Sequence, residues 1–415
     1  MKKLTAISLY TGAGGLDYGF EAAGFRTAVA VENNAVCTKT LRDNRRWSLI
    51  PKSIQAVSTR EILEKGRLRK DDVDIVIGGP PCQPFSKSGY WATGETRRLD
   101  DPRASTIESF LRVVEETRPR SFLMENVEGL GFRGKDEGLT HIIRRLDQIN
   151  ADQGTHYRLC TDVLNAADYG VPQLRKRLFL IAARDGRRFT FPEKGFVPRD
   201  DENPTRKPLH RTAWDALHKT RLRKADGDLA LRGKWADLLP TIPEGRNYLW
   251  HTERGGGEPL FGWRRRYWSF LLKLAKDQPS WTIQAQPGPA TGPFHWSNRR
   301  LSVREMARLQ TFPKDVTISG DYADAQRQLG NAVPSLLAEV LAREISCQLL
   351  DRCVRGVLQL ATPPAAIPPL PPELPKAVPA RYTILLGLHE AHPGTGKGYR
   401  AASRGSDFAG PPQNV

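Results

Sequence analysis

Short apolar segments alternate with amphipathic segments over the first 185 residues of the chain. Five apolar runs have the length and composition of buried strands, at residues 6–10, 28–31, 75–77, 122–124 and 178–181. Between the third run and the fourth, apolar residues follow the i, i+3, i+4, i+7 spacing of a helix with one apolar face: Ile107, Phe110, Leu111 and Val114. Strands that alternate with helices in this way predict an α/β fold with a doubly wound, mostly parallel sheet.

The pattern changes twice more after residue 300. Ser302 and Glu305 form a capping box that predicts the start of a helix, and residues 333–350 predict a longer helix with Pro334 in its first turn. Residues 363–379 are roughly half proline, which indicates a polyproline-like or disordered segment. We therefore expect four parts, residues 1–185, 186–300, 301–350 and a partly disordered, proline-rich tail at 351–415.

Residues 186–300, called the basic module below, carry most of the excess charge. They hold 22 Lys and Arg against 12 Asp and Glu, a net charge of +10 out of +17 for the chain. Seven of the nine tryptophans lie here, at positions 214, 235, 250, 263, 268, 281 and 296. The charge indicates a polyanionic partner, most simply nucleic acid, whereas most of the tryptophans are expected to form the core of the module itself. The alternative is that the charge serves solubility alone.

Composition narrows the class of protein further. The chain has 415 residues, and no apolar run approaches the 18 to 20 residues of a membrane span. The basic start is followed by polar residues and glycines rather than by a signal-peptide cleavage site. Its five cysteines are an odd number without a C-x-x-C pair, which argues against a disulfide framework or a structural zinc and predicts a reducing cytoplasm.

A glycine-rich loop follows the first predicted strand and leads into a helical pattern. The loop runs from Tyr10 to Gly15, and Glu32 ends the second predicted strand. Glycines let a ligand approach the backbone at the carboxyl end of a strand, and a carboxylate there can accept hydrogen bonds from ribose hydroxyls. The pair indicates an adenosine-containing cofactor, although the full dinucleotide and P-loop fingerprints are absent. The alternative is a plain turn between strand and helix.

A second loop places a cysteine after the third predicted strand. Residues 78–86 read Gly-Gly-Pro-Pro-Cys-Gln-Pro-Phe-Ser, with Cys82 at the expected carboxyl edge of the sheet. A thiol with an ordinary pKa of about 8.5 is mostly protonated at neutral pH, yet its thiolate is strongly nucleophilic. Cys82 is therefore a candidate nucleophile, and the alternative is a small buried apolar side chain.

These loops resemble motifs of the cytosine-C5 DNA methyltransferases. Pro80-Pro81-Cys82-Gln83 is similar to the catalytic motif of that family, and the other motifs follow in the family's order. They are Glu-Asn-Val at 125–127, Gln-x-Arg-x-Arg at 173–177, the segment 304–313, and Gln-Leu-Gly-Asn-Ala-Val-Pro at 328–334. The matches span residues 7–345 except the basic module, which lies where the family has its variable target-recognition domain.

The resemblance implies the fold of S-adenosylmethionine-dependent methyltransferases and a role for each matching residue. Cys82 would attack carbon 6 of cytosine, Glu125 would hold a proton or hydrogen bond at N3, and Arg175 and Arg177 would hold the cytosine carbonyl or the carboxylate. S-adenosylmethionine would be bound by Tyr10, Gly12, Gly14, Gly15, Glu32, Ile54, Pro80 and Asn331. The sequence departs from the family at Ser53, Asn33 and Ala332, where an aspartate, an aromatic residue and a serine are usual.

The expected function is sequence-specific methylation of a flipped-out cytosine in double-stranded DNA through a covalent Cys82 adduct. Residues 1–185 would bind the cofactor and catalyse the reaction, residues 301–350 would complete that domain, and the polar segment 87–103 would form a mobile loop. We expect a cytoplasmic monomer without a metal site, paired with a restriction endonuclease that acts independently on the same site. The alternatives are a tRNA-cytosine methyltransferase, a non-catalytic DNA-binding protein and a nicotinamide oxidoreductase.

Overall fold

The structure, a computed structural model, describes residues 3–81, 105–128, 137–199, 207–263 and 267–386. Seven strands form one sheet in the order β3-β2-β1-β4-β5-β7-β6. Strands β1 to β5 run parallel, and β7 is antiparallel to both β5 and β6. The strand bounds are β1 Thr5–Leu9, β2 Arg26–Val31, β3 Ser48–Ile50, β4 Ile75–Gly78, β5 Ser121–Asn126, β6 Cys160–Asn165 and β7 Lys176–Ala183.

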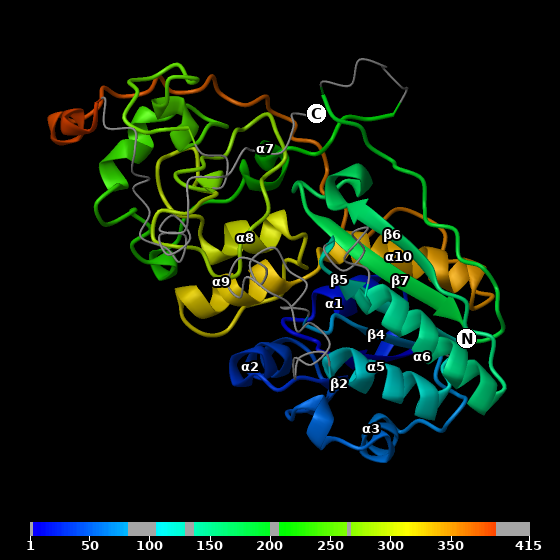
Figure 1. The fold of residues 1–415 in the computed structure, drawn as a ribbon. Helices are drawn as coiled ribbons and strands as arrows, with labels where there is room; N and C mark the ends of the chain where they lie inside the picture. Colours follow the sequence, from blue (N-terminus) through cyan, green and yellow to red (C-terminus); the bar gives the residue numbers. More distant parts are fainter. Residues whose placement is uncertain (1–2, 82–104, 129–136, 200–206, 264–266, 387–415) are drawn as a thin grey trace.

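Helices cover both faces of this sheet (Figure 1). On one face, α1 (Gly15–Ala22) and α10 (Ser335–Gln348) share an apolar core with the strands. On the other face lie α3 (Thr59–Gly66), α5 (Ser105–Thr117) and α6 (Glu137–Gln153), and α2 (Ala35–Asn44) follows β2. The doubly wound, mostly parallel α/β fold predicted from the sequence is therefore confirmed, as are its five predicted strands.

The sequence did not predict β3 or β6. β3 has only three residues, which is too short for a hydrophobic pattern to be recognised. β6 lies at the edge of the sheet, and Thr161, Asp162 and Val163 in its middle are exposed, so it lacks a run of buried residues. Both strands are defined by pairing with a neighbour rather than by their own composition.

The predicted helices after residue 300 are present. Ser302 caps α8 (Val303–Leu309) and forms the expected reciprocal capping box with Glu305. A further helix, α9 (Tyr322–Asn331), precedes α10, and Pro334 is the N-cap of α10 rather than a residue of its first turn. Gly15 lets α1 meet this region closely, because a Cβ at Gly15 would lie 2.3 Å from the carbonyl oxygen of Val333.

The basic module has little regular structure in its described part. It contains the short helix α7 (Ala213–Leu217) and three 3-10 helices, η5 (Lys224–Asp226), η6 (Ala236–Thr241) and η7 (Tyr248–His251). Its β-pairing there consists of isolated bridges. A separate apolar cluster includes Trp235, Tyr248, Phe261 and Phe270, with Trp250 packed against it, so two of the seven tryptophans serve this core rather than most of them. Trp263 and Trp268, in contrast, are 44% and 40% exposed.

The proline-rich segment lies along the basic module. Of residues 351–386, only η9 (Ala380–Leu385) is helical, and none is in a strand. A disulfide joins Cys347 near the end of α10 to Cys353. The expectation of unpaired cysteines is therefore wrong for these two, which α10 and the turn after it bring together. No described helix has the length and apolarity that crossing a membrane requires.

A buried carboxylate connects β1, α1 and β2. Asp17 is fully buried, and its two carboxylate oxygens accept hydrogen bonds from Ser8 Oγ at 2.9 Å and from Thr27 Oγ1 at 3.0 Å. Burial raises the pKa of Asp17 from 3.8 to about 7, although both hydroxyl groups oppose that shift. The group is thus protonated in the folded protein at a pH where it is ionised in the unfolded chain.

We expect Asp17→Asn to remove a pH-dependent loss of stability. Between pH 3.8 and about 7 the unfolded Asp17 is ionised while the folded Asp17 keeps its proton. The free energy of unfolding of the wild type should therefore fall relative to the variant by up to about 1.4 kcal/mol per pH unit in this window, and the difference should level off above it. Urea unfolding of both proteins from about pH 5 to about pH 8 measures this. Parallel stability curves would contradict the assignment.

Candidate active site

The carboxyl ends of β1, β2, β4 and β5 meet at one edge of the sheet. The strand register places Leu9 beside both Val31 and Gly78, and Gly78 beside Met124. Segments that are far apart in the sequence are thus brought together, namely the glycine loop 10–15, the residues after β2, and the loops that follow β4 and β5. In a doubly wound sheet this edge is where ligands bind.

Glu125 lies at this edge, close to the end of β5, and pairs with an arginine of β7. Nε of Arg177 is 2.9 Å from Oε1 of Glu125, and Glu125 is 9% exposed. Antiparallel pairing sets this contact, because Glu125 is opposite Phe179 and Asn126 is opposite Leu178. Gly79 closes the other side, since a Cβ there would lie 2.8 Å from Oε2 of Glu125.

Burial is the largest influence on the Glu125 carboxyl group. It raises the pKa of Glu125, while the positive charges of Arg177 and Arg175 oppose the shift. A carboxyl group whose pKa is raised by burial and lowered by nearby arginines is able to exchange a proton with a bound ligand. Arg177 fixes its orientation, and Gly79 leaves Oε2 in contact with the backbone of the loop that precedes Cys82.

Arg175 is positioned differently from Arg177. It is 1% exposed, its Nη2 donates to the carbonyl oxygen of Gly330 at 2.7 Å, and its Nη1 donates to that of Ile283 at 3.4 Å. Burial, followed by the charge of Arg177, lowers the pKa of Arg175. Arg177 thus contacts the Glu125 carboxylate directly, whereas Arg175 donates to carbonyl oxygens of α9 and the basic module and acts on Glu125 through its charge.

Two buried glutamines that the sequence reasoning did not single out connect the same segments. Gln173 Nε2 donates to the carbonyl oxygen of Leu309 and to Gln310 Oε1, both at 3.2 Å, and Gln173 Oε1 accepts from the amide of Ile283 at 3.1 Å. Gln310 Nε2 donates in turn to the carbonyl oxygen of Leu329. Their positions inside the matched motifs were the only sequence signal, since glutamine has no distinctive pattern in a buried role.

The glycine loop and Glu32 form the second part of the site. The two carboxylate oxygens of Glu32 accept hydrogen bonds from the amides of Gly12 and Asn34, each at 2.7 Å. Gly12 and Gly14 have φ angles of 57° and 87°, and no atom of the described residues lies within 4 Å of where a Cβ of Gly12 would be. Tyr10 also has a positive φ, and its hydroxyl donates to the carbonyl oxygen of Thr106 at 2.7 Å. Open space therefore adjoins a carboxylate and an aromatic side chain.

The remaining predicted residues have mixed surroundings. Ile54 is buried and its carbonyl oxygen accepts from Arg112, whereas Asn331 is exposed at the end of α9. Pro80 is buried, and its carbonyl oxygen accepts from Nδ2 of Asn126 at 3.3 Å. Cys82 and the segment 87–103 lie in a gap of the described residues, which stop at Pro81 and resume at residue 105. The described part of the chain contains no cluster of three or more His, Cys, Asp or Glu side chains suited to a metal ion.

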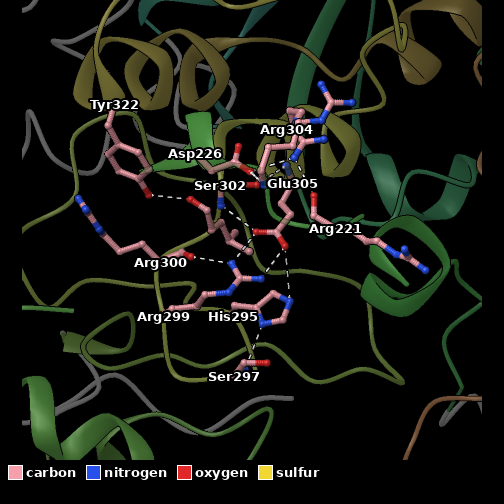
Figure 2. Close-up of polar contacts among 12 residues, drawn as sticks. Arg221, Asp226, His295, Ser297, Arg299, Arg300, Ser302, Arg304, Glu305 and Tyr322 are labelled. Atoms are coloured by element: carbon pink, nitrogen blue, oxygen red, sulfur yellow. Dashed lines mark hydrogen bonds and ion pairs between the residues drawn. The ribbon is translucent and has the colours of Figure 1, made fainter. Parts of the chain in front are cut away.

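A dense polar network joins the end of the basic module to α8 (Figure 2). The carboxylate of Glu305, 1% exposed, accepts two hydrogen bonds from Arg299 at 2.8 and 2.7 Å and one from the amide of Ser302 at 2.7 Å. His295 lies 3.7 Å from Glu305, and burial lowers the pKa of His295 to about 4, so that it is neutral near pH 7. Arg304 donates to Asp226 at 2.9 Å. These contacts fix the course of the chain where it passes from the basic module back to the catalytic part.

The comparisons with known proteins agree with this geometry. The family model of the C-5 cytosine-specific DNA methylases matches residues 4–347. Type II methyltransferase M.SacI of Streptomyces achromogenes is 40% identical over 378 residues, which cover 84% of this chain and 94% of that protein. Type II methyltransferase M1.HphI of Haemophilus parahaemolyticus is 34% identical over 354 residues, or 82% of this chain and 86% of that one.

Solved structures share the fold at lower sequence identity. DNMT2 of Spodoptera frugiperda superposes with a TM-score of 0.57 and 16% identity, over 82% of this chain and 99% of that one. Dnmt2 methyltransferase of S. pombe gives a TM-score of 0.52 at 16% identity, over 83% of this chain and 99% of that one. The family match over most of the chain, together with relatives of this identity, shows that the chain belongs to the C-5 cytosine-specific DNA methylases.

Proposed function

We propose that this DNA cytosine-C5 methyltransferase modifies a flipped-out cytosine within a specific site of double-stranded DNA, using S-adenosylmethionine and a covalent adduct with Cys82. The contact between Arg177, Glu125 and Gly79 carries the proposal. It holds a buried carboxyl group against the loop whose next residues are Pro80, Pro81 and Cys82. A thiol and a proton-exchanging carboxyl group near each other are what this reaction needs.

Carbon 5 of cytosine is a poor nucleophile, and the proposed residues make it reactive. The thiolate of Cys82 forms a bond to carbon 6, and the negative charge that develops on the ring is relieved at N3 by a proton or hydrogen bond from Glu125. Carbon 5 then takes the methyl group, and the bond between that methyl group and the sulfur of the donor would break. Water takes up the proton on carbon 5, and Glu125 takes back the proton held at N3. The electron pair left on carbon 5 restores the double bond to carbon 6 as the bond between that carbon and the Cys82 sulfur breaks, which releases the product and the free thiolate. The raised pKa of Glu125 suits it to hold the proton.

The glycine loop suits an adenosine-containing methyl donor. S-adenosylmethionine, when bound, supplies an electrophilic methyl group on a positively charged sulfur. Glu32 would accept hydrogen bonds from the ribose, and the open space beside Gly12 admits a ligand against the backbone. Tyr10, Gly14, Gly15, Ile54, Pro80 and Asn331 complete the proposed set, and the absence of a side chain at Gly15 also lets α1 pack against Val333.

The basic module is the part proposed to hold DNA. Its net charge of +10 accompanies two exposed tryptophans, and the guanidinium of Arg254 lies 4.5 Å from the ring centre of Trp263. A pocket between the end of the module and α9 is lined mainly by apolar residues, with polar and basic side chains that include Gln286, Arg300 and Arg327. Arginine and glutamine are suited to phosphates and to base edges in the major groove.

We further propose that the protein acts as a monomer in the cytoplasm, alongside a restriction endonuclease that cuts the same DNA site independently. The relatives that support this are named Type II methyltransferases. Methylation of that site would then protect the DNA of the host cell. Deep bisulfite sequencing of DNA from cells that express the protein identifies the methylated site.

Transfer of a tritiated methyl group from S-adenosylmethionine to duplex DNA tests the proposed chemistry. The wild type should label the DNA, and Cys82→Ala should lower the rate by at least about three orders of magnitude, because the nucleophile is removed. Cys160→Ala is a matched control, since Cys160 is a free thiol at the start of β6, and it should keep the wild-type rate. Full methylation by Cys82→Ala would disprove the assignment of the nucleophile.

Binding of cognate DNA should weaken steeply as salt is added. Each phosphate neutralised by Lys or Arg releases condensed counterions, so the logarithm of the association constant should fall linearly with the logarithm of the salt concentration, by about 0.9 per phosphate contact. Fluorescence anisotropy of labelled duplex DNA over a series of salt concentrations measures the slope. A flat response would show that the charge of the basic module serves solubility instead.

A further inference from the structure

We propose that residues 351–386, called the C-terminal strap below, hold the basic module in its orientation over the catalytic edge, with Tyr382 as a positioning residue for DNA binding. The match to the family model ends at residue 347, so the strap is an addition to what that model describes. The inference rests on the proposed function, because it assigns the strap a role in holding DNA.

The first part of the strap, residues 356–360, is held against the catalytic part by hydrogen bonds to a buried carboxylate and its arginine partner. Glu339 of α10 is 0% exposed, and its two oxygens accept hydrogen bonds from the amides of Gln359 at 2.8 Å and Leu360 at 2.9 Å. Arg343, one turn further along α10, pairs with Glu339 and donates to the carbonyl oxygens of Gly356 and Val357 at 2.7 and 2.8 Å. Charge-assisted hydrogen bonds of this kind are about twice as strong as neutral ones.

Backbone groups in the middle of the strap form hydrogen bonds with side-chain and backbone groups of the basic module. The amide of Ala365 donates to Asp215 at 2.7 Å, and Nε1 of Trp214 donates to the carbonyl oxygen of Ile367 at 2.7 Å. Further along, the amide of Lys376 donates to the carbonyl oxygen of Pro240 at 3.0 Å. The strap therefore contacts first α7 and then η6, two separate elements in the first half of the module's sequence.

The end of the strap supplies part of the module's core. Tyr382 is 3% exposed, and its ring stacks on Trp235 at 5.8 Å with an angle of 18° between the planes. Its hydroxyl donates to the carbonyl oxygen of Lys234 at 2.5 Å. Val378 and Leu385 pack against the same cluster. The core of the basic module is thus incomplete without Val378, Tyr382 and Leu385, which lie far beyond its expected end at residue 300.

Proline makes this connection stiff. Eight of the residues from 363 to 379 are proline, and an extended proline-rich chain spans roughly 3.1 Å per residue with a persistence of several residues. Proline also reduces the conformational freedom that the unbound segment would otherwise have, which lowers the entropic cost of attaching it. A stiff segment that is anchored at both ends transmits the position of one anchor to the other.

The strap adds a connection at the end of the module that is remote from the sheet. The module leaves the catalytic part near Asp168, which contacts His210 at 3.0 Å, and returns through the network around Glu305 (Figure 2). The bonds of Gln173 and Arg175 to Ile283 also lie on the side of the module that faces the catalytic part. In Figure 1 the strap runs from α10 across the module to η9 at its far side, where an additional anchor opposes rotation of the module about the contacts near the sheet.

A loosened module should bind DNA less tightly while the cofactor site is unchanged. Tyr382→Ala removes the stacked ring, and Ile384→Ala is its matched control because Ile384 lies in the same turn, η9, and is 72% exposed. We expect Tyr382→Ala to raise the KM for cognate DNA at least tenfold and to reduce discrimination against near-cognate DNA. The Kd and stoichiometry of S-adenosylmethionine binding should stay at wild-type values, as should every parameter of Ile384→Ala.

A nicked enzyme tests the same claim if Tyr382→Ala does not fold. A protease site placed at Glu373 and Leu374, the latter 90% exposed, lies between the anchors and can be cut after folding. Complete cleavage should raise the KM for DNA, and protease-treated wild type is the control. An unchanged KM, or a loss confined to kcat and to the fraction of folded enzyme, would overturn the proposal. If wild-type protein bound S-adenosylmethionine but transferred no methyl group to DNA, the proposed function would fail instead.

Discussion

The ion pair between Arg177 and Glu125 is the interaction on which the catalytic edge depends. A buried carboxyl group without a partner would lose its proton only at high pH and would have no fixed orientation. Arg177 supplies both the partner and the orientation, and it does so because β7 runs antiparallel to β5 and brings its first residues to the carboxyl end of that strand. The reversed strand next to β5 is therefore what brings Arg177 to Glu125.

Arg175 and Gln173 extend that arrangement into the rest of the molecule. They precede Arg177 on the same segment, and their hydrogen bonds reach Ile283 of the basic module, Gly330 of α9 and the end of α8. The module and the return segment are thus bound to the strand that carries the ion pair. Together with the network at Glu305 and the C-terminal strap, these contacts relate the proposed DNA-binding surface to the proposed site of chemistry.

The sequence patterns predicted those elements of structure that depend on residues close together in the chain. Buried strands such as residues 75–77 and the capping box at Ser302 depend on neighbouring residues, and they were found where expected. The hydrogen-bond partners of Arg175 could not be predicted, because they are carbonyl groups far away in the sequence. The position of Tyr382 against Trp235 likewise depends on packing between distant segments. No sequence pattern within residues 351–386 indicates that packing.

A double-mutant cycle at the ion pair tests the account most directly. Single-turnover rates of methyl transfer would be measured for Glu125→Gln, for Arg177→Gln and for the double variant, each saturated with S-adenosylmethionine and cognate DNA. If Arg177 acts by holding Glu125, Arg177→Gln should lower the rate much less in the Glu125→Gln background than in the wild type. The expected coupling is at least about 1.4 kcal/mol, or tenfold in rate. Rate losses that simply add would show that the two residues act independently and would contradict the account.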